Sequence, residues 1–174
     1  MMDDGKRNAL IAFYSFSGNC RELGRVMAGA VGGDIGEIVP RQEIPRGFLA
    51  KYLKGGKASL FKERAEILPF KADPAAYRLA IVGTPVWFWN LPPASRSFLA
   101  GRPWAGIKAA CYATYRGAAG RALASMRELI QQGGGIVLGT EAFVDLRWRK
   151  AEKTRGRAAL WAREMLRAAD GQKG

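Results

Sequence analysis

The chain has 174 residues, 48% of them hydrophobic, and carries 28 Lys and Arg against 15 Asp and Glu, a formal net charge of +13. This length suits one compact core, so the sequence predicts a single domain over residues 1–174. The chain has no histidine and only two cysteines, Cys20 and Cys111. These counts exclude His-dependent catalytic triads, His-ligated metals and a disulfide framework.

Two segments hold most of the positive charge. Residues 40–64 contain seven Lys or Arg against two acids, and residues 146–174 contain nine against three. Together they carry +11 of the net +13, so the rest of the domain is nearly neutral. Such patches indicate an anionic partner, but solvated basic faces that keep a protein in solution have the same composition. The sequence leaves both interpretations open.

The N-terminal residues 1–8 are polar and charged, unlike a secretory signal. No apolar stretch reaches the ~20 residues that a helix needs to cross a bilayer. We therefore expect a cytoplasmic protein with no membrane span.

Apolar runs and helical spacing alternate along the chain. In chain order, the sequence predicts a strand over residues 8–14, a helix over 20–31 and a strand over 35–39. An insertion over 41–72 follows, with short helices near 48–53 and 58–65. The rest of the chain is predicted to form a strand over 78–84, a helix over 94–100, a strand over 108–114, a helix over 118–132, a strand over 135–140, and a basic C-terminal segment over 147–169 that is helical around 157–169.

The predicted strands are apolar throughout instead of alternating, which is typical of a parallel sheet covered on both faces. Right-handed crossovers leave few topologies for such a chain. The sequence therefore predicts an α/β fold with a doubly wound, five-stranded parallel sheet in the order 2-1-3-4-5. Its ligand crevice would lie beyond the carboxyl ends of the first and third strands.

A polar loop joins the first strand to the first helix. It consists of Ser15, Phe16, Ser17, Gly18, Asn19 and Cys20. Backbone amides of a tight turn, two hydroxyls and a helix N-terminus converge there, and a phosphate monoester is bound by such groups. The alternative is a plain strand-to-helix turn with Asn19 as the N-cap.

Two further loops follow the third and fourth strands. The first of them contains Thr84, Pro85, Val86, Trp87, Phe88, Trp89 and Asn90, and the second contains Thr114, Tyr115, Arg116 and Gly117. Aromatic side chains held between prolines offer a rigid face for a flat conjugated ring, although they could also fold back over the core. With the polar loop, they predict a ligand that has both a phosphate and a flat ring.

These motifs resemble the flavodoxin family over roughly residues 9–139. The phosphate loop of that family has the form Thr/Ser-x-Thr/Ser-Gly-x-Thr, and Ser15, Ser17, Gly18 and Cys20 occupy those places. Residues 77–99 resemble the second flavin loop and the helix after it. The resemblance implies FMN, with its phosphate on residues 15–20 and its isoalloxazine between the loops at 84–90 and 114–117.

The resemblance implies a redox function, either electron transfer or reduction of a small acceptor such as a quinone. Three features depart from the family, and one of them is the crowding of Trp87, Phe88 and Trp89, which could either grip the ring or fill its place. Cys20 stands where a hydroxyl is usual, and the chain is strongly basic whereas electron-carrier flavodoxins are typically acidic. The alternative function is a flavodoxin-like binding or regulatory module without flavin.

Three side chains or segments allow two interpretations each. Cys20 at a helix N-terminus could be a reactive thiol with a lowered pKa, or a small loop residue. Arg116 could point toward the flavin and favour its reduced form, or toward solvent. The C-terminal segment invites nucleic-acid binding, but Ala158, Trp161, Ala162, Met165 and Ala169 share one helical face, which indicates packing on the sheet and makes nucleic acid the less favoured partner.

Overall fold

Five parallel strands form one sheet in the order β2-β1-β3-β4-β5, which confirms the predicted topology. The computed structural model describes residues 5–42, 65–146 and 151–171. Its strands are β1 (Arg7–Phe13), β2 (Asp34–Glu37), β3 (Tyr77–Pro85), β4 (Lys108–Tyr115) and β5 (Ile136–Val144). Its helices are α1 (Asn19–Val31), the 3-10 turn η2 (Pro74–Ala76), α3 (Pro93–Ala100), α4 (Ala122–Gln132) and α5 (Ala151–Gly171).

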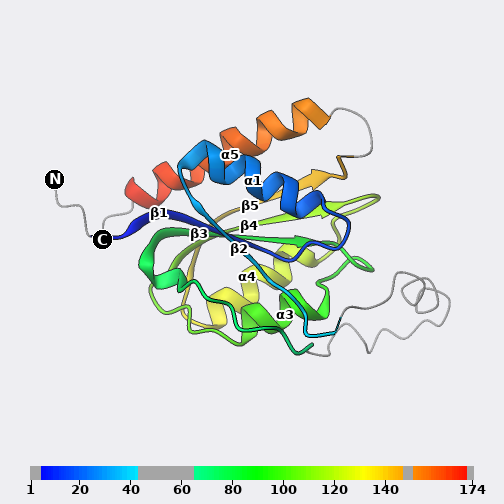
Figure 1. Ribbon diagram of the computed structural model, residues 1–174, viewed down its shortest axis with the longest axis horizontal. Helices are drawn as coiled ribbons and strands as arrows, with labels where there is room; N and C mark the ends of the chain where they lie inside the picture. The colour runs from blue at the N-terminus through cyan, green and yellow to red at the C-terminus, as the bar shows by residue number, and fades with distance from the viewer. Residues whose placement is uncertain (1–4, 43–64, 147–150, 172–174) are drawn as a thin grey trace.

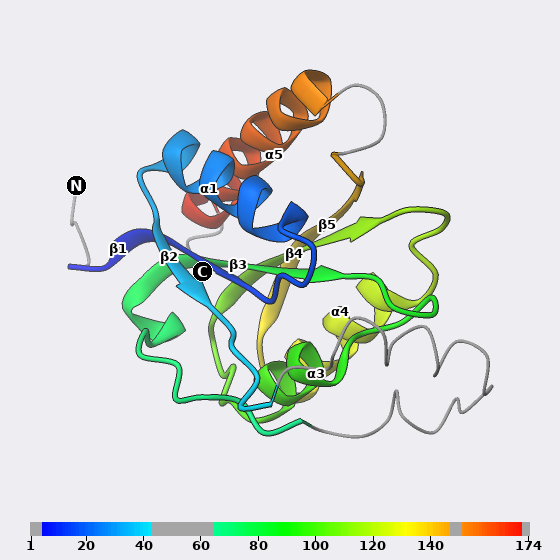
Figure 2. The ribbon, with the colours of Figure 1, turned by 45° about the vertical axis from the view of Figure 1, so that its right-hand side comes forward.

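Helices cover both faces of the sheet, with α1 and α5 on one face and α3 and α4 on the other (Figures 1 and 2). Successive residues of β1 point to opposite faces, as in any strand. Ile11 and Phe13 enter the core under α1 and α5, whereas Leu10 and Ala12 enter the core under α3 and α4. Because both sets are buried, a strand at such a position needs apolar residues throughout.

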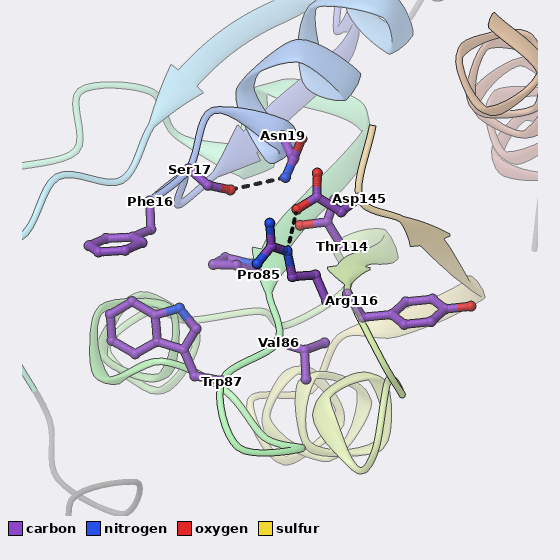
Figure 3. A pocket seen from close by; sticks show the side chains of 10 residues that line it. Phe16, Ser17, Asn19, Pro85, Val86, Trp87, Thr114, Arg116 and Asp145 are labelled. Atoms are coloured by element: carbon purple, nitrogen blue, oxygen red, sulfur yellow. Dashed lines mark hydrogen bonds and ion pairs between the residues drawn. The ribbon is translucent and has the colours of Figure 1, made fainter. Parts of the chain in front are cut away.

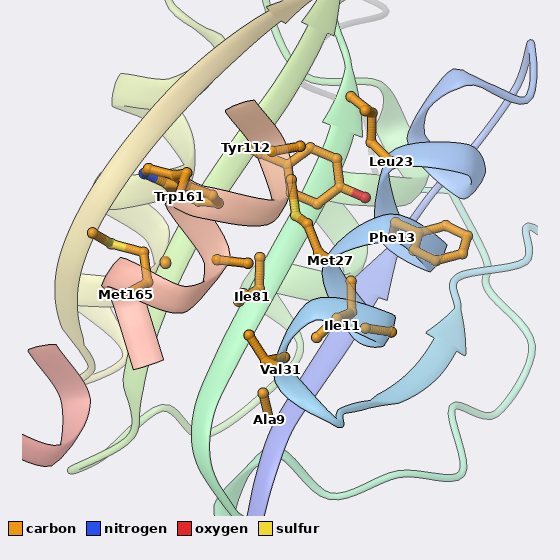
Figure 4. Close-up of a cluster of buried hydrophobic side chains, with 14 of the residues drawn as sticks. Ala9, Ile11, Phe13, Leu23, Met27, Val31, Ile81, Tyr112, Trp161 and Met165 are labelled. Carbon is orange, nitrogen blue, oxygen red and sulfur yellow. The ribbon is translucent and has the colours of Figure 1, made fainter. Parts of the chain in front are cut away.

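The core under α1 and α5 is drawn in Figure 4, where Met27 of α1 and Trp161 of α5 meet side chains of the sheet. The buried residues of α5 are the five predicted from its helical spacing. The helix is longer than predicted and begins at Ala151. Near its start, Arg155 forms an ion pair with Glu22 of α1, which links the two helices.

Several elements differ in their bounds from the prediction. Helix α4 begins at Ala122 instead of residue 118, because Gly120 adopts a left-handed φ of 54° and the Arg121 amide bonds the Trp89 carbonyl at 2.7 Å. Strand β5 continues to Val144 instead of residue 140, since it pairs with β4 along its whole length. Shifts of a few residues occur at the ends of β1, β2 and α1.

The two ends of the predicted insertion at 41–72 run side by side. Pro40 and Ile67 form an antiparallel bridge, and the Arg41 amide donates to the Glu66 carbonyl at 2.8 Å. The short helices predicted at 48–53 and 58–65 lie outside the described residues, apart from position 65, which is not helical. The described ends therefore show where the insertion leaves the domain, between β2 and β3.

A buried tyrosine fixes the start of α1 against the sheet. Tyr112 of β4 lies opposite Gly83 of β3, and its hydroxyl donates to the Cys20 carbonyl at 2.8 Å. A Cβ at Gly83 would lie 2.0 Å from the Tyr112 ring. The missing side chain of Gly83 therefore leaves the space through which Tyr112 reaches helix α1.

We expect Gly83→Ala to lower the free energy of unfolding by about 1–3 kcal/mol, because the extra methyl forces Tyr112 out of its place. Gly29→Ala is the matched control, since a Cβ there has no heavy atom within 4 Å. In a helix interior this control should raise stability by roughly 0.5–1 kcal/mol. Urea unfolding monitored by tryptophan fluorescence measures both changes, and equal stability of the two variants would contradict this account.

Candidate functional site

A cavity of about 300 Å³ lies beyond the carboxyl ends of β1, β3, β4 and β5. The chain turns outward in opposite directions from β1 and β3, so this is the switch point where doubly wound sheets bind ligands. The residues that line the cavity are Phe16, Ser17, Asn19, Pro85, Val86, Trp87, Thr114, Tyr115, Arg116 and Asp145. Figure 3 shows their side chains around the opening.

The loop between β1 and α1 is held by its own polar side chains. The Ser15 hydroxyl accepts the Arg21 amide at 3.1 Å, and the Asn19 side-chain amide donates to the Ser17 hydroxyl at 3.0 Å. Gly18 is the N-cap residue, with a left-handed φ of 94°, so the N-cap predicted at Asn19 was wrong by one residue. Gly18 takes this place because glycine adopts a positive φ without steric cost.

The first turn of α1 opens toward the cavity. Among the described residues, no protein acceptor is found for the backbone amides of residues 17–20. Amides of a first helical turn lack partners within the helix, and the helix dipole adds partial positive charge there. Ser17 and Asn19 line the cavity beside these amides. This end of the site can therefore bind an anion.

Trp87 forms part of the cavity wall. Its ring packs edge-on against Tyr14, with centroids 5.9 Å apart, and against Phe16, with centroids 5.3 Å apart. Only 8% of Trp87 is exposed, and the cavity beside it remains open. Trp87 thus presents an immobilised aromatic surface to the cavity without filling it, and Figure 3 shows it on the same side as Phe16.

Phe88 and Trp89 form a tight turn that leads away from the cavity. The Trp87 and Asn90 backbones exchange two hydrogen bonds, of 3.0 and 2.8 Å, around this two-residue turn. Phe88 has φ 48° and Trp89 has φ 61°, the left-handed geometry that such turns require and that large side chains adopt only with strain. Trp89 is 66% exposed. The two aromatics therefore do not line the cavity wall that Trp87 forms.

Two polar residues of the same loop form hydrogen bonds with neighbouring helices and with the loop backbone. Thr84 is buried, and its hydroxyl lies 2.7 Å from that of Ser95 on α3. The Asn90 side-chain oxygen accepts the Leu91 amide at 2.8 Å and the Ser125 hydroxyl at 3.1 Å. These bonds fix the loop between α3 and α4 and so hold Trp87 in place.

The far wall carries the charged groups of the cavity. The Arg116 Nε donates to the Asp145 carboxylate at 3.2 Å, a pair drawn as a dashed line in Figure 3. The Asp145 amide bonds the Tyr115 carbonyl at 2.9 Å, so the end of β5 joins the loop after β4. Asp145 was not among the predicted site residues, because the apolar pattern ended the fifth strand at residue 140 and gave no sign that Asp145 lies at this edge of the sheet.

Cys20 lies beneath the cavity instead of lining it. Its thiol is 3.0 Å from the Thr114 hydroxyl, and burial raises the pKa of Cys20 to about 12. Burial likewise raises the pKa of Cys111 to about 12. Since the thiolate is the reactive form, Cys20 has the character of a small core residue and not of a nucleophile.

The sequence-predicted site residues fall into two groups. Those that line the cavity are Phe16, Ser17, Asn19, Pro85, Val86, Trp87, Thr114, Tyr115 and Arg116. Those that lie behind or beside it are Ser15, Gly18, Cys20, Thr84, Phe88, Trp89, Asn90 and Gly117. Each of the three predicted loops thus contributes to one cavity, and part of each loop supports it from outside.

The fold and the cavity define an α/β protein with an open cavity at the switch point of a doubly wound sheet. A family model described as Flavodoxin matches residues 8–154, so the chain belongs to the flavodoxin family. No curated protein matches the sequence. None of the described helices has the length and apolar character of a membrane-spanning helix.

Solved structures with low sequence identity share the fold. A candidate flavoprotein from Bacteroides uniformis ATCC 8492 matches with a TM-score of 0.72 at 20% identity, covering 91% of this chain and 99% of its own. A flavoprotein in complex with FMN from Lactobacillus acidophilus NCFM matches with a TM-score of 0.61 at 19% identity, covering 85% and 98%. The WrbA-like flavodoxin from Agrobacterium tumefaciens matches with a TM-score of 0.63 at 13% identity, covering 95% and 99%.

We expect both thiols to resist modification in the folded protein at neutral pH. A pKa near 12 keeps each sulfur protonated there, and burial blocks access. A chromogenic disulfide reagent should react with two thiols per chain in guanidinium chloride and with almost none in native buffer. Fast modification of one native thiol, located to Cys20 by peptide mapping, would contradict the buried position of its side chain.

Proposed function

We propose that this protein binds FMN in the cavity and works as a redox protein, which transfers electrons or reduces a small acceptor such as a quinone. The observation that carries the proposal is one open cavity with an anion-binding helix terminus at one end and a fixed aromatic wall beside it. Membership of the flavodoxin family supports it. A structural neighbour whose own structure holds FMN supports it further.

The phosphate of FMN fits the first turn of α1. The amides of residues 17–20 have no protein acceptor among the described residues, so a phosphate would satisfy groups that a dry site would otherwise leave unpaired. The Ser17 hydroxyl accepts from Asn19 and can still donate its proton. Ser17 and Asn19 would therefore orient the phosphate.

The flat ring of FMN fits the space between the second and third loops. Trp87 and Tyr115 come from these two loops, and both line the cavity together with Pro85 and Val86. The edge-on contacts of Trp87 with Tyr14 and Phe16 fix its plane before a ligand arrives, which lowers the entropic cost of binding. Trp87 would therefore exclude water from one side of the ring.

Bound FMN supplies the one- and two-electron chemistry, and the protein supplies orientation and charge. Thr114 and Cys20 bond one another at the floor of the site and keep it closed from below. Arg116 and Asp145 supply its charges. The alternative, a module without flavin, would be favoured by a filled cavity; instead, Trp87 leaves the cavity open.

An absorbance spectrum of the purified protein, followed by titration with FMN, is the direct test. Ser17→Ala should weaken FMN binding roughly tenfold to a hundredfold, because a hydrogen bond to a charged phosphate contributes ~1.5–3 kcal/mol. Ser97→Ala on α3 is the matched control, since the buried Ser97 hydroxyl has no partner in the described structure and lies outside the cavity. An unchanged dissociation constant for Ser17→Ala would place the phosphate elsewhere.

We propose further that the redox partner or substrate is anionic. The basic segments at 40–64 and 146–174 carry +11 of the net +13. On the described part of α5, Arg155 and Arg157 are paired with Glu22 and Glu141, while Lys153 and Arg167 are exposed. Exposed charge of this kind speeds the encounter with an opposite charge.

The rate of electron transfer to an acidic redox partner should fall as salt rises, because surface charges are screened over a Debye length of ~8 Å at physiological ionic strength. Stopped-flow measurement across a salt series, with neutral benzoquinone as the control acceptor, gives the dependence. A rate with the acidic partner that is as insensitive to salt as the rate with benzoquinone would assign the basic segments to solubility alone.

A further inference from the structure

Strand β5 is an outer strand of the sheet and, in the part of the chain that the structure describes, has a neighbouring strand on one side only. The residues of β4, which has neighbours on both sides, are almost all buried, whereas those of β5 are mostly half-buried. The outer strand at the other end of the sheet, β2, has four residues, but β5 has nine. A long open edge of this kind is a template for pairing with another strand.

Three residues of β5 direct their backbone groups toward the open edge. The Asp145 amide bonds the Tyr115 carbonyl of β4, so residue 145 faces inward. Backbone groups alternate between the two sides of a strand, and the register with β4 runs without a shift from Thr140 to Val144. The N–H and C=O groups of Thr140, Ala142 and Val144 therefore point outward.

Two charged side chains cover the outward groups of Ala142. The Ala142 amide donates to the Glu141 carboxylate at 3.1 Å, and its carbonyl accepts from the Arg157 guanidinium of α5. Glu141 and Arg157 also pair with each other at 3.0 Å, and the guanidinium lies 4.8 Å from the centre of the Phe143 ring. The pair thus supplies the acceptor and the donor that a neighbouring strand would otherwise provide.

An antiparallel pair of β5 strands centred on Ala142 would use all the outward groups. Thr140 of one copy would lie opposite Val144 of the partner subunit, and the two Ala142 residues would lie opposite each other. Each of these pairs is of the kind that exchanges two backbone hydrogen bonds. Among the described residues, the outward groups of Thr140 and Val144 have no bonding partner, so a second copy would satisfy them.

The charges beside this edge are self-complementary about the same two-fold axis. In this register Glu141 lies opposite Phe143 of the partner subunit, and opposite side chains share one face with Cβ atoms about 4.5–5.5 Å apart. The Arg157 guanidinium of each copy lies over its own Phe143 ring. Glu141 therefore comes within reach of the partner's Arg157, and the ion pair within each chain can be exchanged for one between chains.

We propose that the outer edge of β5 is a self-association surface on which two copies of this chain pair antiparallel about Ala142. Within one chain, Glu141 and Arg157 cover the Ala142 backbone and keep the edge closed. In the dimer, the two Ala142 backbones bond each other, and each Glu141 bonds the partner's Arg157. The inference is independent of the proposed function, because the antiparallel arrangement places the two cavities at opposite ends of the dimer.

Charge-reversal variants test the exchange of ion pairs directly. Glu141→Arg brings two positive groups together, and Arg157→Glu brings two negative groups together, so neither variant alone can form the pair within or between chains. In an equimolar mixture each reversed residue meets its opposite charge across the axis. Sedimentation equilibrium should give the mass of one chain for each variant alone and of two chains for the mixture, with roughly tenfold tighter association or more.

The matched controls reverse the same two residue types elsewhere on α5. Glu164 and Arg167 are exposed, and among the described residues they bond no residue of β5. A mixture of Glu164→Arg and Arg167→Glu should therefore keep the mass of one chain. Thr140→Pro in either member of the first mixture should abolish the dimer, because proline lacks the outward N–H and is tolerated only where that side of a strand is free.

Hydrogen exchange locates the interface in the mixed dimer. The amides of Thr140, Ala142 and Val144 should exchange more slowly in the mixture than in either variant alone. If a reversal variant fails to fold by circular dichroism, Glu141→Lys with Arg157→Asp repeats the test. A mixture that keeps the mass of one chain, a dimer that survives Thr140→Pro, or protection confined to other segments would each overturn the proposal.

Discussion

The hydrogen bond from Tyr112 to the Cys20 carbonyl connects the sheet to the first turn of α1, and the site depends on it. The bond passes through space that Gly83 leaves open, so it needs glycine on β3 and tyrosine on β4, whereas the helix start supplies only a backbone carbonyl. It fixes the position of the first turn of α1 relative to the carboxyl ends of the strands, and with it the backbone amides of residues 17–20. The neighbouring Cys20–Thr114 contact then closes the floor between the same two elements.

The loops after β3 and β4 are joined to each other as well as to the sheet. The Arg121 amide bonds the Trp89 carbonyl, and a Cβ at Gly120 would lie 2.3 Å from that of Trp89. The loops after β3 and β4 are thus packed directly together, and this contact supports the strained turn at Phe88 and Trp89. Strain of about 1–3 kcal/mol per residue persists only where surrounding structure holds it.

The net charge of the whole chain and the charges that line the cavity differ in sign balance and in exposure to solvent. The high net positive charge lies mainly in two segments of sequence and is screened by salt. The site contains a buried carboxylate beside an exposed guanidinium, so the local balance differs from the overall one. The charges that line the cavity therefore do not follow from the net charge of the chain.

The amino-acid sequence by itself determined the topology and the edge of the sheet at which the cavity lies. Strands apolar at every position require cover on both faces, and parallel strands bring their carboxyl ends, and the loops that follow, to one edge. Only the tertiary structure decided which side chains face the cavity. Trp87 and Trp89 are two residues apart, yet one forms the wall and the other is exposed, because Phe88 and Trp89 form a left-handed turn that reverses the chain after Trp87. Asp145 lies at the cavity beside Arg116, and the Cys20 thiol is buried against Thr114. Both contacts join segments that are far apart in the chain, so the spacing of residues along the sequence does not predict them.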